Sequence, residues 1–209
     1  MAEDKVKIEE EINNKKIPIN FQEKKFGSTL LMIAIYNNKY ESVKTLLKLG
    51  ADPNLHDTYT GKTAVIVAAK NDDLKYLRLL LNYKGDPNSI ENTFNKKIKN
   101  ESTIIDSAIT ASISSNIEDN SFEKVKLLVE KGADINYFKR GYIQSPLAES
   151  LIQERMDIAE YLLRKGADYK KPIIISVTNN EKEVSVLYLL RASIIDLKSP
   201  QYQKKKRNC

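Results

Sequence analysis

The chain has 209 residues, a formal net charge of +6, one cysteine and one histidine, which excludes a disulfide framework, a cysteine-based metal site and an imidazole cluster. The charge alone does not indicate a nucleic-acid binder, because the 34 lysines and arginines are interleaved with 28 acidic residues. Met1–Lys5 lacks signal-peptide features, and no apolar run approaches the roughly eighteen residues that span a bilayer, so we expect a cytoplasmic protein.

The chain opens with a charged segment, residues 4–25, whose few apolar positions lead into the turn Ile17-Pro18-Ile19-Asn20. Asn20 precedes Asn54 by 34 residues, a spacing that recurs along the rest of the chain. We predict that this segment is half of a repeat unit, a lone helix followed by a turn. A half unit of this kind would cover one end of a stack of repeats.

The stretch from Phe26 to Asn88 contains one unit twice, at a constant offset of 34 residues. The two copies begin at Gly27 and Gly61, and the turns that close them end at Asn54 and Asn88. A fixed period of this size is typical of stacked-repeat proteins, in which each unit buries its apolar face against its neighbours.

Each unit has the pattern of two helices. The first is an almost wholly apolar run after Thr29, whose hydroxyl can cap the first turn, and we expect it to be buried between neighbouring units. The second is an amphipathic stripe at helical spacing, formed by Tyr40, Val43, Leu46 and Leu47 and repeated by Leu74, Leu77, Leu80 and Leu81. Gly50 ends the second helix, but Lys84 takes its place in the next unit, and we expect that stop to move to Gly85.

These residues resemble the ankyrin repeat, whose pattern begins G-x-T-P-L-H-x-A-A and ends L-L-x-x-G-A-D-x-N. The matching positions are Gly27, Thr29, Leu31, Ala34, Leu46, Leu47, Gly50, Ala51, Asp52 and Asn54. The family's proline and histidine are Leu30 and Met32 here, so apolar contact should replace the histidine's hydrogen bonding. The resemblance implies an all-α ankyrin-repeat solenoid of stacked helix-turn-helix units with β-hairpin or loop fingers, which binds proteins through its finger tips and concave face.

The third unit carries 14 additional residues, because Asp86 and Asp134 are 48 residues apart. We predict its first helix at residues 102–108, with six of the additional residues before that helix and eight after it. They form two insertions, Ser89–Asn100 and Ser112–Asn120. Long connectors cost little entropy and are often functional, so these insertions are either functional or passive loops.

The fourth unit returns to the 34-residue register and closes at Asp168. The apolar runs of residues 172–197 then predict a closing helix pair, and residues 198–209 form a basic tail that we expect to be loose. The predicted organisation is one ankyrin repeat domain over residues 1–197, with a half-repeat cap at 4–25, repeats at about 26–59, 60–99, 100–142 and 143–171, and the closing pair at 172–197.

The sequence offers no catalytic constellation. His56 has no second histidine, nucleophile or metal-ligand partner at a suitable spacing, and we interpret it as an exposed loop residue. Asp106 stands where the family has its histidine, and we assign it a structural role. We predict no enzymatic activity, no cofactor and no metal.

The predicted partner-binding surface is rich in tyrosine and arginine, which combine apolar area with directional hydrogen bonding. Its candidate residues, at inner-helix ends and finger tips, are Tyr36, Tyr59, Lys70, Tyr137, Phe138, Arg140, Tyr142 and Gln153. We rank the finger Tyr137–Tyr142 first, because it places three aromatic rings and two cations within six residues. The alternative is a local cluster in which Phe138 or Tyr142 folds against the preceding finger.

Two functions remain as hypotheses. The first is a monomeric, non-enzymatic protein that binds or blocks a partner protein, as a bacterial inhibitor, an immunity-type protein or a host-directed ankyrin protein does. The second is binding of nucleic acid or an anionic membrane through the basic run Lys204–Arg207, a pattern that also suits nuclear import. A host-directed role would require secretion into the host.

Overall fold

The computed structural model describes residues 10, 14, 17–91, 107–114, 120–138, 144–177 and 180–188, and of residues 172–183 it describes the backbone alone. The chain forms two compact units, Met1–Asp134 and Ile135–Cys209.

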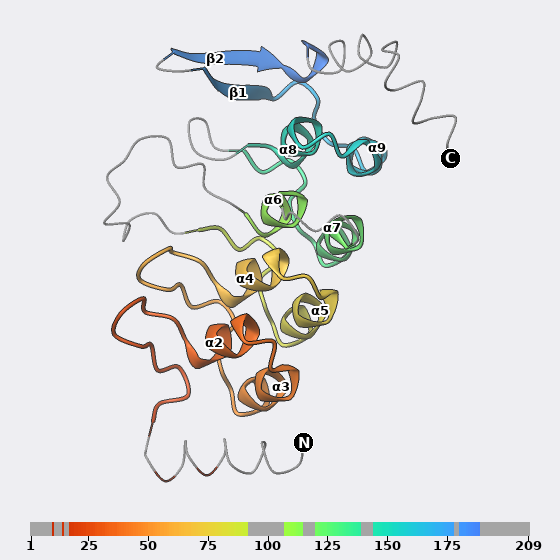
Figure 1. Ribbon diagram of the computed structural model, residues 1–209. Helices are drawn as coiled ribbons and strands as arrows, with labels where there is room; N and C mark the ends of the chain where they lie inside the picture. Colours follow the sequence, from red (N-terminus) through yellow and green to blue (C-terminus); the bar gives the residue numbers. More distant parts are fainter. Residues whose placement is uncertain are drawn as a thin grey trace, which may run out of the picture. The chain divides into compact units, whose positions relative to one another are not determined.

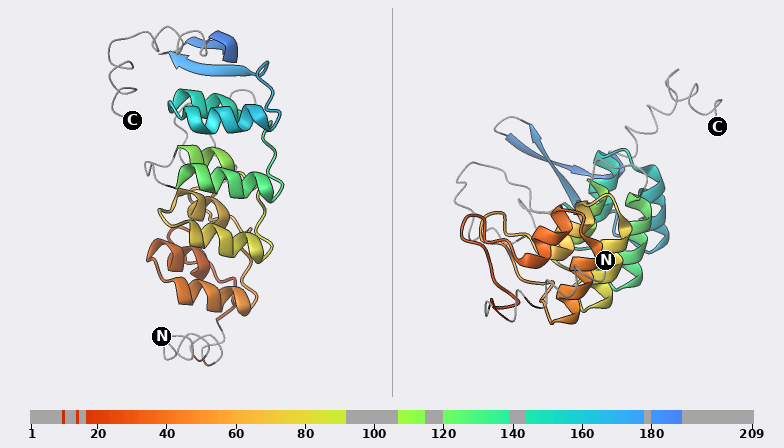
Figure 2. Two further views of the ribbon diagram at one scale, coloured as in Figure 1. Left: turned by 90° about the vertical axis from the view of Figure 1, so that its right-hand side faces the viewer. Right: turned by 60° about the horizontal axis from the view of Figure 1, so that its bottom comes forward.

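The described part of the first unit is a stack of helix pairs (Figures 1 and 2). Its helices are α2 (Leu30–Tyr36), α3 (Tyr40–Lys48), α4 (Ala64–Lys70), α5 (Leu74–Asn82), α6 (Ala108–Ile113) and α7 (Ser121–Glu130). Helices α2, α4 and α6 form an inner column, and α3, α5 and α7 form an outer one. The described helices therefore confirm the predicted all-α ankyrin-type solenoid.

The inner column forms the core of this unit. Residues 64–69 of α4 and residues 108–113 of α6 are all buried, as an apolar run between two neighbouring repeats requires. Each inner helix begins at a hydroxyl cap: Thr29, Thr63 and Ser107 each accept a hydrogen bond from the backbone N–H three residues later, at 3.2–3.3 Å. The predicted cap at Thr29 and the predicted burial of the first helix are confirmed.

The outer helices bury the predicted apolar stripe. Its fully or almost fully buried members are Val43, Leu46, Leu47, Leu77, Leu80, Leu81, Val125 and Leu128. The opposite faces of α3 and α5 carry exposed polar side chains such as Lys48 and Arg78. Each outer helix is therefore amphipathic, with its apolar side against the inner column.

Asparagine side chains join the turns of successive repeats. In each case the asparagine Oδ1 accepts a backbone N–H at 2.7–2.8 Å, and the pairs are Asn20 with Asp52, Asn54 with Asp86, and Asn88 with Asp134. Asn20 thus occupies the same position as its counterparts one and two repeats later. This bond supports the prediction that a half unit precedes the first full repeat.

The end of α5 differs from the prediction. Lys84 has a φ of 65°, the left-handed conformation that Gly50 adopts at φ 92° after α3, so the stop does not move to Gly85. Gly85 is needed for a different reason, which is space. A Cβ atom at Gly85 would lie 2.9 Å from both the Leu80 carbonyl oxygen and Val65 Cγ2. The glycine is therefore needed at position 85, and Lys84 adopts the left-handed conformation although this conformation is unfavourable for a residue with a side chain.

The first helix of the third repeat begins later than predicted. Ser107 is extended and caps α6, which starts at Ala108, where the predicted helix of residues 102–108 ended. Ser107 and Thr110 form a capping box, which fixes the start of α6. Since Ser107 follows Thr63 by 44 residues, ten of the fourteen additional residues precede the cap and four follow it.

The second unit contains α8 (Pro146–Ile152), α9 (Met156–Arg164) and a two-stranded antiparallel sheet of β1 (Pro172–Val177) and β2 (Asn180–Ser185). The strands pair Pro172 with Ser185 and Val177 with Asn180. The predicted closing helix pair is therefore wrong over residues 172–185. Residues 173–175 are three isoleucines, and β-branched side chains lose less freedom in a strand than in a helix.

Candidate functional site

Two neighbouring fingers of the first unit are built around carboxylates that lie 34 residues apart. The Asp57 carboxylate accepts hydrogen bonds from the backbone N–H groups of residues 59–62. The Glu23 carboxylate accepts hydrogen bonds from the backbone N–H groups of residues 25, 26 and 28. An ionised carboxylate is an acceptor at both oxygens, which lets one side chain fix a whole turn.

Gln22 and His56, also 34 residues apart, tie successive fingers together. Gln22 Nε2 donates to the His56 carbonyl at 2.8 Å, and His56 Nε2 lies 3.0 Å from the Ile90 carbonyl oxygen. A carbonyl only accepts, so Nε2 must carry the proton in this contact. His56 is half-buried and structural, and its interpretation as an exposed loop residue is wrong.

The tips of these two fingers are in direct contact. The rings of Phe26 and Tyr59 meet edge to face, with centroids 5.4 Å apart, and the Tyr59 N–H donates to the Phe26 carbonyl at 3.1 Å. Gly27, at φ 68°, approaches Thr58 so closely that a Cβ atom would lie 2.1 Å from the threonine hydroxyl oxygen. Glycine therefore permits both the turn and the contact between fingers.

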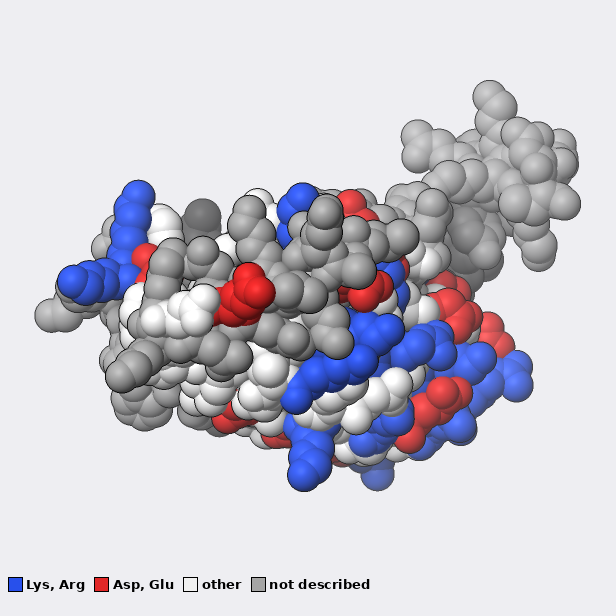
Figure 3. All heavy atoms as spheres, turned by 90° about the horizontal axis from the view of Figure 1, so that it is seen from below, with Lys and Arg blue, Asp and Glu red and all other residues white. Residues whose placement is uncertain are grey.

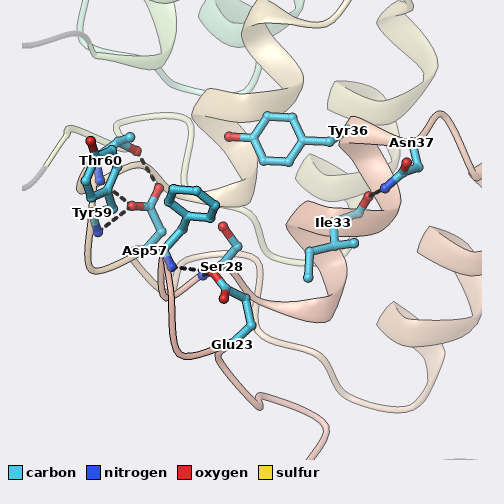
Figure 4. A pocket seen from close by; sticks show the side chains of 9 residues that line it. Glu23, Ser28, Ile33, Tyr36, Asn37, Asp57, Tyr59 and Thr60 are labelled. Atoms are coloured by element: carbon cyan, nitrogen blue, oxygen red, sulfur yellow. Dashed lines mark hydrogen bonds between the residues drawn. The ribbon is translucent and has the colours of Figure 1, made fainter.

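An open pocket of about 440 Å³, here named the finger pocket, lies between these tips and the end of α2 (Figure 4). It is lined by Glu23, Phe26, Ser28, Ile33, Tyr36, Asn37, Asp57, Tyr59 and Thr60. In Figure 4 the Tyr36 side chain projects from the C-terminal end of α2 with its hydroxyl group directed toward the finger side. The pocket is thus walled by aromatic and aliphatic side chains that are also exposed to solvent.

Negative charges set the electrostatics of the finger pocket. Burial raises the pKa of the Tyr36 hydroxyl, and the charges of Asp57 and Glu91 raise it further. Burial also acts to raise the pKa of Glu23, but backbone hydrogen bonds to its carboxylate outweigh that effect and lower it. The lowered pKa of Glu23 keeps its carboxylate ionised near neutral pH.

The finger pocket contains two of the residues predicted to bind a partner. Tyr36 is 56 % exposed and Tyr59 is 44 % exposed, and both line the pocket. Lys70, at the end of α4, lies 4.0 Å from a carboxylate oxygen of Glu91, which Lys62 also approaches at 3.9 Å. Lys70 therefore belongs to an ion-pair group beside the pocket and does not line it.

The other predicted residues lie elsewhere. Gln153, at the end of α8, is exposed and donates to Glu149 at 3.0 Å. In the finger of residues 137–142, Tyr137 and Phe138 are half-buried. The remaining members of the prediction, Arg140 and Tyr142, lie outside the described residues, as do Asp106 and the basic run Lys204–Arg207. Their roles stay predictions.

Two further residues of the finger pocket, Phe26 and Ile33, were not singled out from the sequence. Phe26 carries a weak signal, because an aromatic side chain directly before a turn glycine has no helix or strand to bury it. Ile33 carries no such signal, because it lies within an apolar run that is otherwise almost wholly buried. Only the packing of α2 reveals that one of its aliphatic side chains faces the fingers.

Among the residues that the structure describes, no three His, Cys, Asp or Glu side chains are grouped so that they could hold a metal ion. The same part of the chain has no helix with the length and apolar character that a membrane span requires.

The family described as "Ankyrin repeats (3 copies)" matches residues 8–91 and 31–139. The chain therefore belongs to the ankyrin repeat family, whose members generally act as protein–protein interaction modules. The chain is also similar to BRCA1-associated RING domain protein 1 of Caenorhabditis elegans, with 43 % identity over 54 residues. That match covers 26 % of this chain but only 8 % of the relative.

Proposed function

We propose that this protein acts by occupancy: it binds another protein through the finger pocket and the surrounding finger tips, and it carries out no chemistry of its own. The observation that carries the proposal is the exposed aromatic group formed by Phe26, Tyr36 and Tyr59. Aromatic side chains bury large apolar area at low entropic cost and are enriched in interface hot spots. Their rigid attachment supports the same proposal, because interlocked fingers hold Phe26 and Tyr59.

Within this proposal the chain works as a cytoplasmic monomer that blocks its partner, as a bacterial inhibitor or immunity-type protein does, or as a host-directed ankyrin protein does after delivery. A blocking role needs only a rigid surface that covers part of the partner. Light scattering during size-exclusion chromatography tests the monomer directly. A stable dimer at micromolar concentration would contradict that part of the proposal.

The experiment that tests partner binding is a comparison of two double variants. The test variant, Tyr36→Ser with Tyr59→Ser, removes aromatic side chains from the finger pocket. The control variant, Tyr169→Ser with Tyr188→Ser, removes two tyrosines of closely similar exposure, 43 % and 59 %, from the second unit. Partners are captured from the native cell with the wild-type chain, identified by mass spectrometry, purified and titrated against all three proteins.

We expect the test variant to bind the purified partner more weakly by at least ~2 kcal/mol, which is the threshold for an interface hot spot. The control variant should bind within about 0.5 kcal/mol of the wild type and unfold at nearly the wild-type urea concentration, whereas the test variant should lose at most ~1.5 kcal/mol of stability with the edge-to-face contact between Tyr59 and Phe26. Equal weakening by the two variants, or no weakening by the test variant, would contradict the proposal.

A further inference from the structure

We propose that the finger pocket binds a basic side chain of the partner, the guanidinium of arginine or the ammonium of lysine. This inference rests on the proposed function and specifies the chemistry of the segment that is bound. It follows from two features of the site, the nature of its walls and the charges that line it, and the surroundings of Tyr36 agree with the second.

The walls suit a cation with an apolar stem. Phe26, Tyr36 and Tyr59 supply three aromatic rings, and Ile33 supplies aliphatic surface. Ring faces attract cations, most strongly when the cation is partly removed from water. The Phe26 ring already makes one such contact, since Lys25 Nζ, which does not belong to the pocket lining, lies 4.7 Å from its centroid. Arginine and lysine also carry a methylene stem that can lie along apolar surface while the charged group meets the rings.

The charged side chains that line the finger pocket are both acidic. They are Glu23 and Asp57, and within the described part of the chain no lysine or arginine lines the pocket. Backbone N–H groups, and at Asp57 also the Thr60 hydroxyl group, donate hydrogen bonds to both carboxylates without neutralising their charge, and the Asp57 side chain is buried. Neither carboxylate has a lysine or arginine nitrogen at ion-pair distance among the described residues. The lining therefore has negative charge that a bound cation would compensate.

The charges around Tyr36 also favour a positively charged occupant. Burial comes first among the causes that raise the pKa of its hydroxyl group, and the negative charges of Asp57 and Glu91 add to that shift. The burial part of this shift disfavours a charge of either sign, whereas the part that comes from Asp57 and Glu91 disfavours only a further negative charge and favours a cation. The chain as a whole has a net charge of +6, so this local preference is opposite to the overall charge.

The size of the pocket fits this occupant. At about 440 Å³ it falls in the lower part of the range for ligand sites, which is large enough for one long side chain. Because the overall positive charge repels basic segments at long range, we expect selectivity to arise from close contact rather than from accelerated association.

The test uses four capped pentapeptides with the pattern glycine-leucine-X-leucine-glycine, in which X is arginine, lysine, citrulline or glutamate. Citrulline has nearly the shape of arginine but no charge, so the pair isolates the effect of the cation. The full chain, labelled with ¹³C in its aromatic rings, is titrated with each peptide, and the ring resonances of Phe26, Tyr36 and Tyr59 report binding. Tyr36→Ser serves as the site variant and Tyr188→Ser as the control.

We expect the arginine and lysine peptides to bind roughly tenfold more tightly than the citrulline peptide, in line with a cation–π contact aided by nearby carboxylates. The glutamate peptide should bind more weakly still. Tyr36→Ser should remove most of the preference for arginine over citrulline, and Tyr188→Ser should leave it unchanged. Raising NaCl from about 50 mM to about 500 mM should weaken only the cationic peptides toward the citrulline value.

Equal affinity for arginine and citrulline, or no saturable shift with the arginine peptide up to roughly 5 mM, would overturn the inference. A preference for arginine that survives Tyr36→Ser would overturn it too, because the cation would then bind elsewhere. These failures differ from failure of the proposed function. Suppose that the Tyr36 and Tyr59 double variant loses the partner while the peptides show no charge preference. The proposal that the finger pocket binds a partner is then retained, and the inference that it binds a basic side chain is rejected. If instead the double variant keeps the partner while the peptides show the charge preference, the finger pocket is a cation site but not the partner-binding surface.

Discussion

Lys84 adopts a left-handed backbone conformation that costs a lysine about 1 kcal/mol relative to glycine. The variant Lys84→Gly should therefore raise the free energy of unfolding by roughly 0.5–1 kcal/mol in urea denaturation. The hydrogen bond from Asn54 Nδ2 to the Lys84 carbonyl, at 3.0 Å, uses only the backbone and should survive. The neighbouring Gly85→Ala change is the contrasting variant, because its Cβ would lie 2.9 Å from backbone and side-chain atoms. Stabilisation by Gly85→Ala together with destabilisation by Lys84→Gly would refute this account of the turn.

Lys124, on α7, is the clearest buried charge among the described residues. Its side chain is fully buried, and within the described part of the chain its Nζ atom has no hydrogen-bond partner. Burial lowers the pKa of the Lys124 ammonium, and the negative charge of Asp72 opposes that shift only in part. A buried ammonium without partners destabilises the folded state, so Lys124→Met, which keeps length and apolar volume, should stabilise the protein by roughly 1–3 kcal/mol at pH 7.

The same variant has a defined pH dependence. The pKa of Lys124 is lower in the folded than in the unfolded chain, so the burial penalty is complete while the lysine is charged in both states. The penalty decreases as the pH rises through the folded-state pKa toward the ordinary lysine value of 10.5. The stability difference between Lys124→Met and the wild type should therefore be largest at neutral pH and narrow at alkaline pH. Urea unfolding at several pH values measures it, and a difference that widens with pH would contradict the assignment.

At the scale of the element, equivalent hydrogen bonds join successive fingers, but they use different side chains as donors. Gln22 donates to the next finger with an amide, and His56 donates to the following one with an imidazole. His56→Gln should therefore keep most of the stability, within about 0.5 kcal/mol, whereas His56→Ala should lose roughly 1 kcal/mol. Urea unfolding of the two variants decides the point. Equal losses would mean that the ring packs but its hydrogen bond contributes nothing.

The buried stripe of the outer helices makes the strongest stability prediction. Leu80 is completely buried on α5, between neighbouring repeats, so Leu80→Ala should cost roughly 2–5 kcal/mol in urea unfolding. Glu10→Ala is the control, since Glu10 is exposed and the change should fall within about 0.5 kcal/mol of zero. A cost below about 1 kcal/mol at Leu80 would mean that the packing of α5 in solution differs from that described.

What the sequence could predict at this scale depended on repetition. Helices α2 to α5 follow from a pattern written twice, and tertiary packing only reinforces that pattern. Helix α6 lies outside the predicted range because the third unit is a single copy with 14 additional residues, so no second copy shows where its first helix begins. The hairpin of residues 172–185 was missed because an apolar run between turns does not by itself distinguish strand from helix.

The residues of the finger pocket also differ in whether the sequence could identify them. Tyr36 and Tyr59 were accessible to sequence reasoning because the repeat alignment places them at a helix end and a finger tip. Phe26 and Ile33 depend on which way two side chains face, and no periodicity contains that information. The carboxylates Glu23 and Asp57 could have been found, since they align at the period of 34 residues and begin the two finger turns.

For the whole molecule, the remaining question is whether the net charge of +6 has a function. Figure 3 shows lysine and arginine side chains gathered on the face at the N-terminal end, with aspartate and glutamate side chains among them. Mixed charge of this kind is typical of a solvated surface and gives no continuous basic field. The concentrated positive charge is instead in the sequence run Lys204–Arg207, which supplies four of the six net charges.

Deleting residues 204–209 therefore separates the two hypotheses about binding. If the protein binds its partner through the finger pocket, the deletion should leave the affinity for the purified partner unchanged within about twofold, because no residue of the pocket is touched. If the basic run binds nucleic acid, the full chain should bind duplex DNA with a salt dependence of up to about four phosphate contacts, a log–log slope near −3.6, and the deletion should abolish that slope. We expect the first result, and a shallow slope for DNA that the deletion hardly changes. A steep slope that disappears with the basic run, together with loss of the partner, would establish the charged run as the binding element in place of the finger pocket.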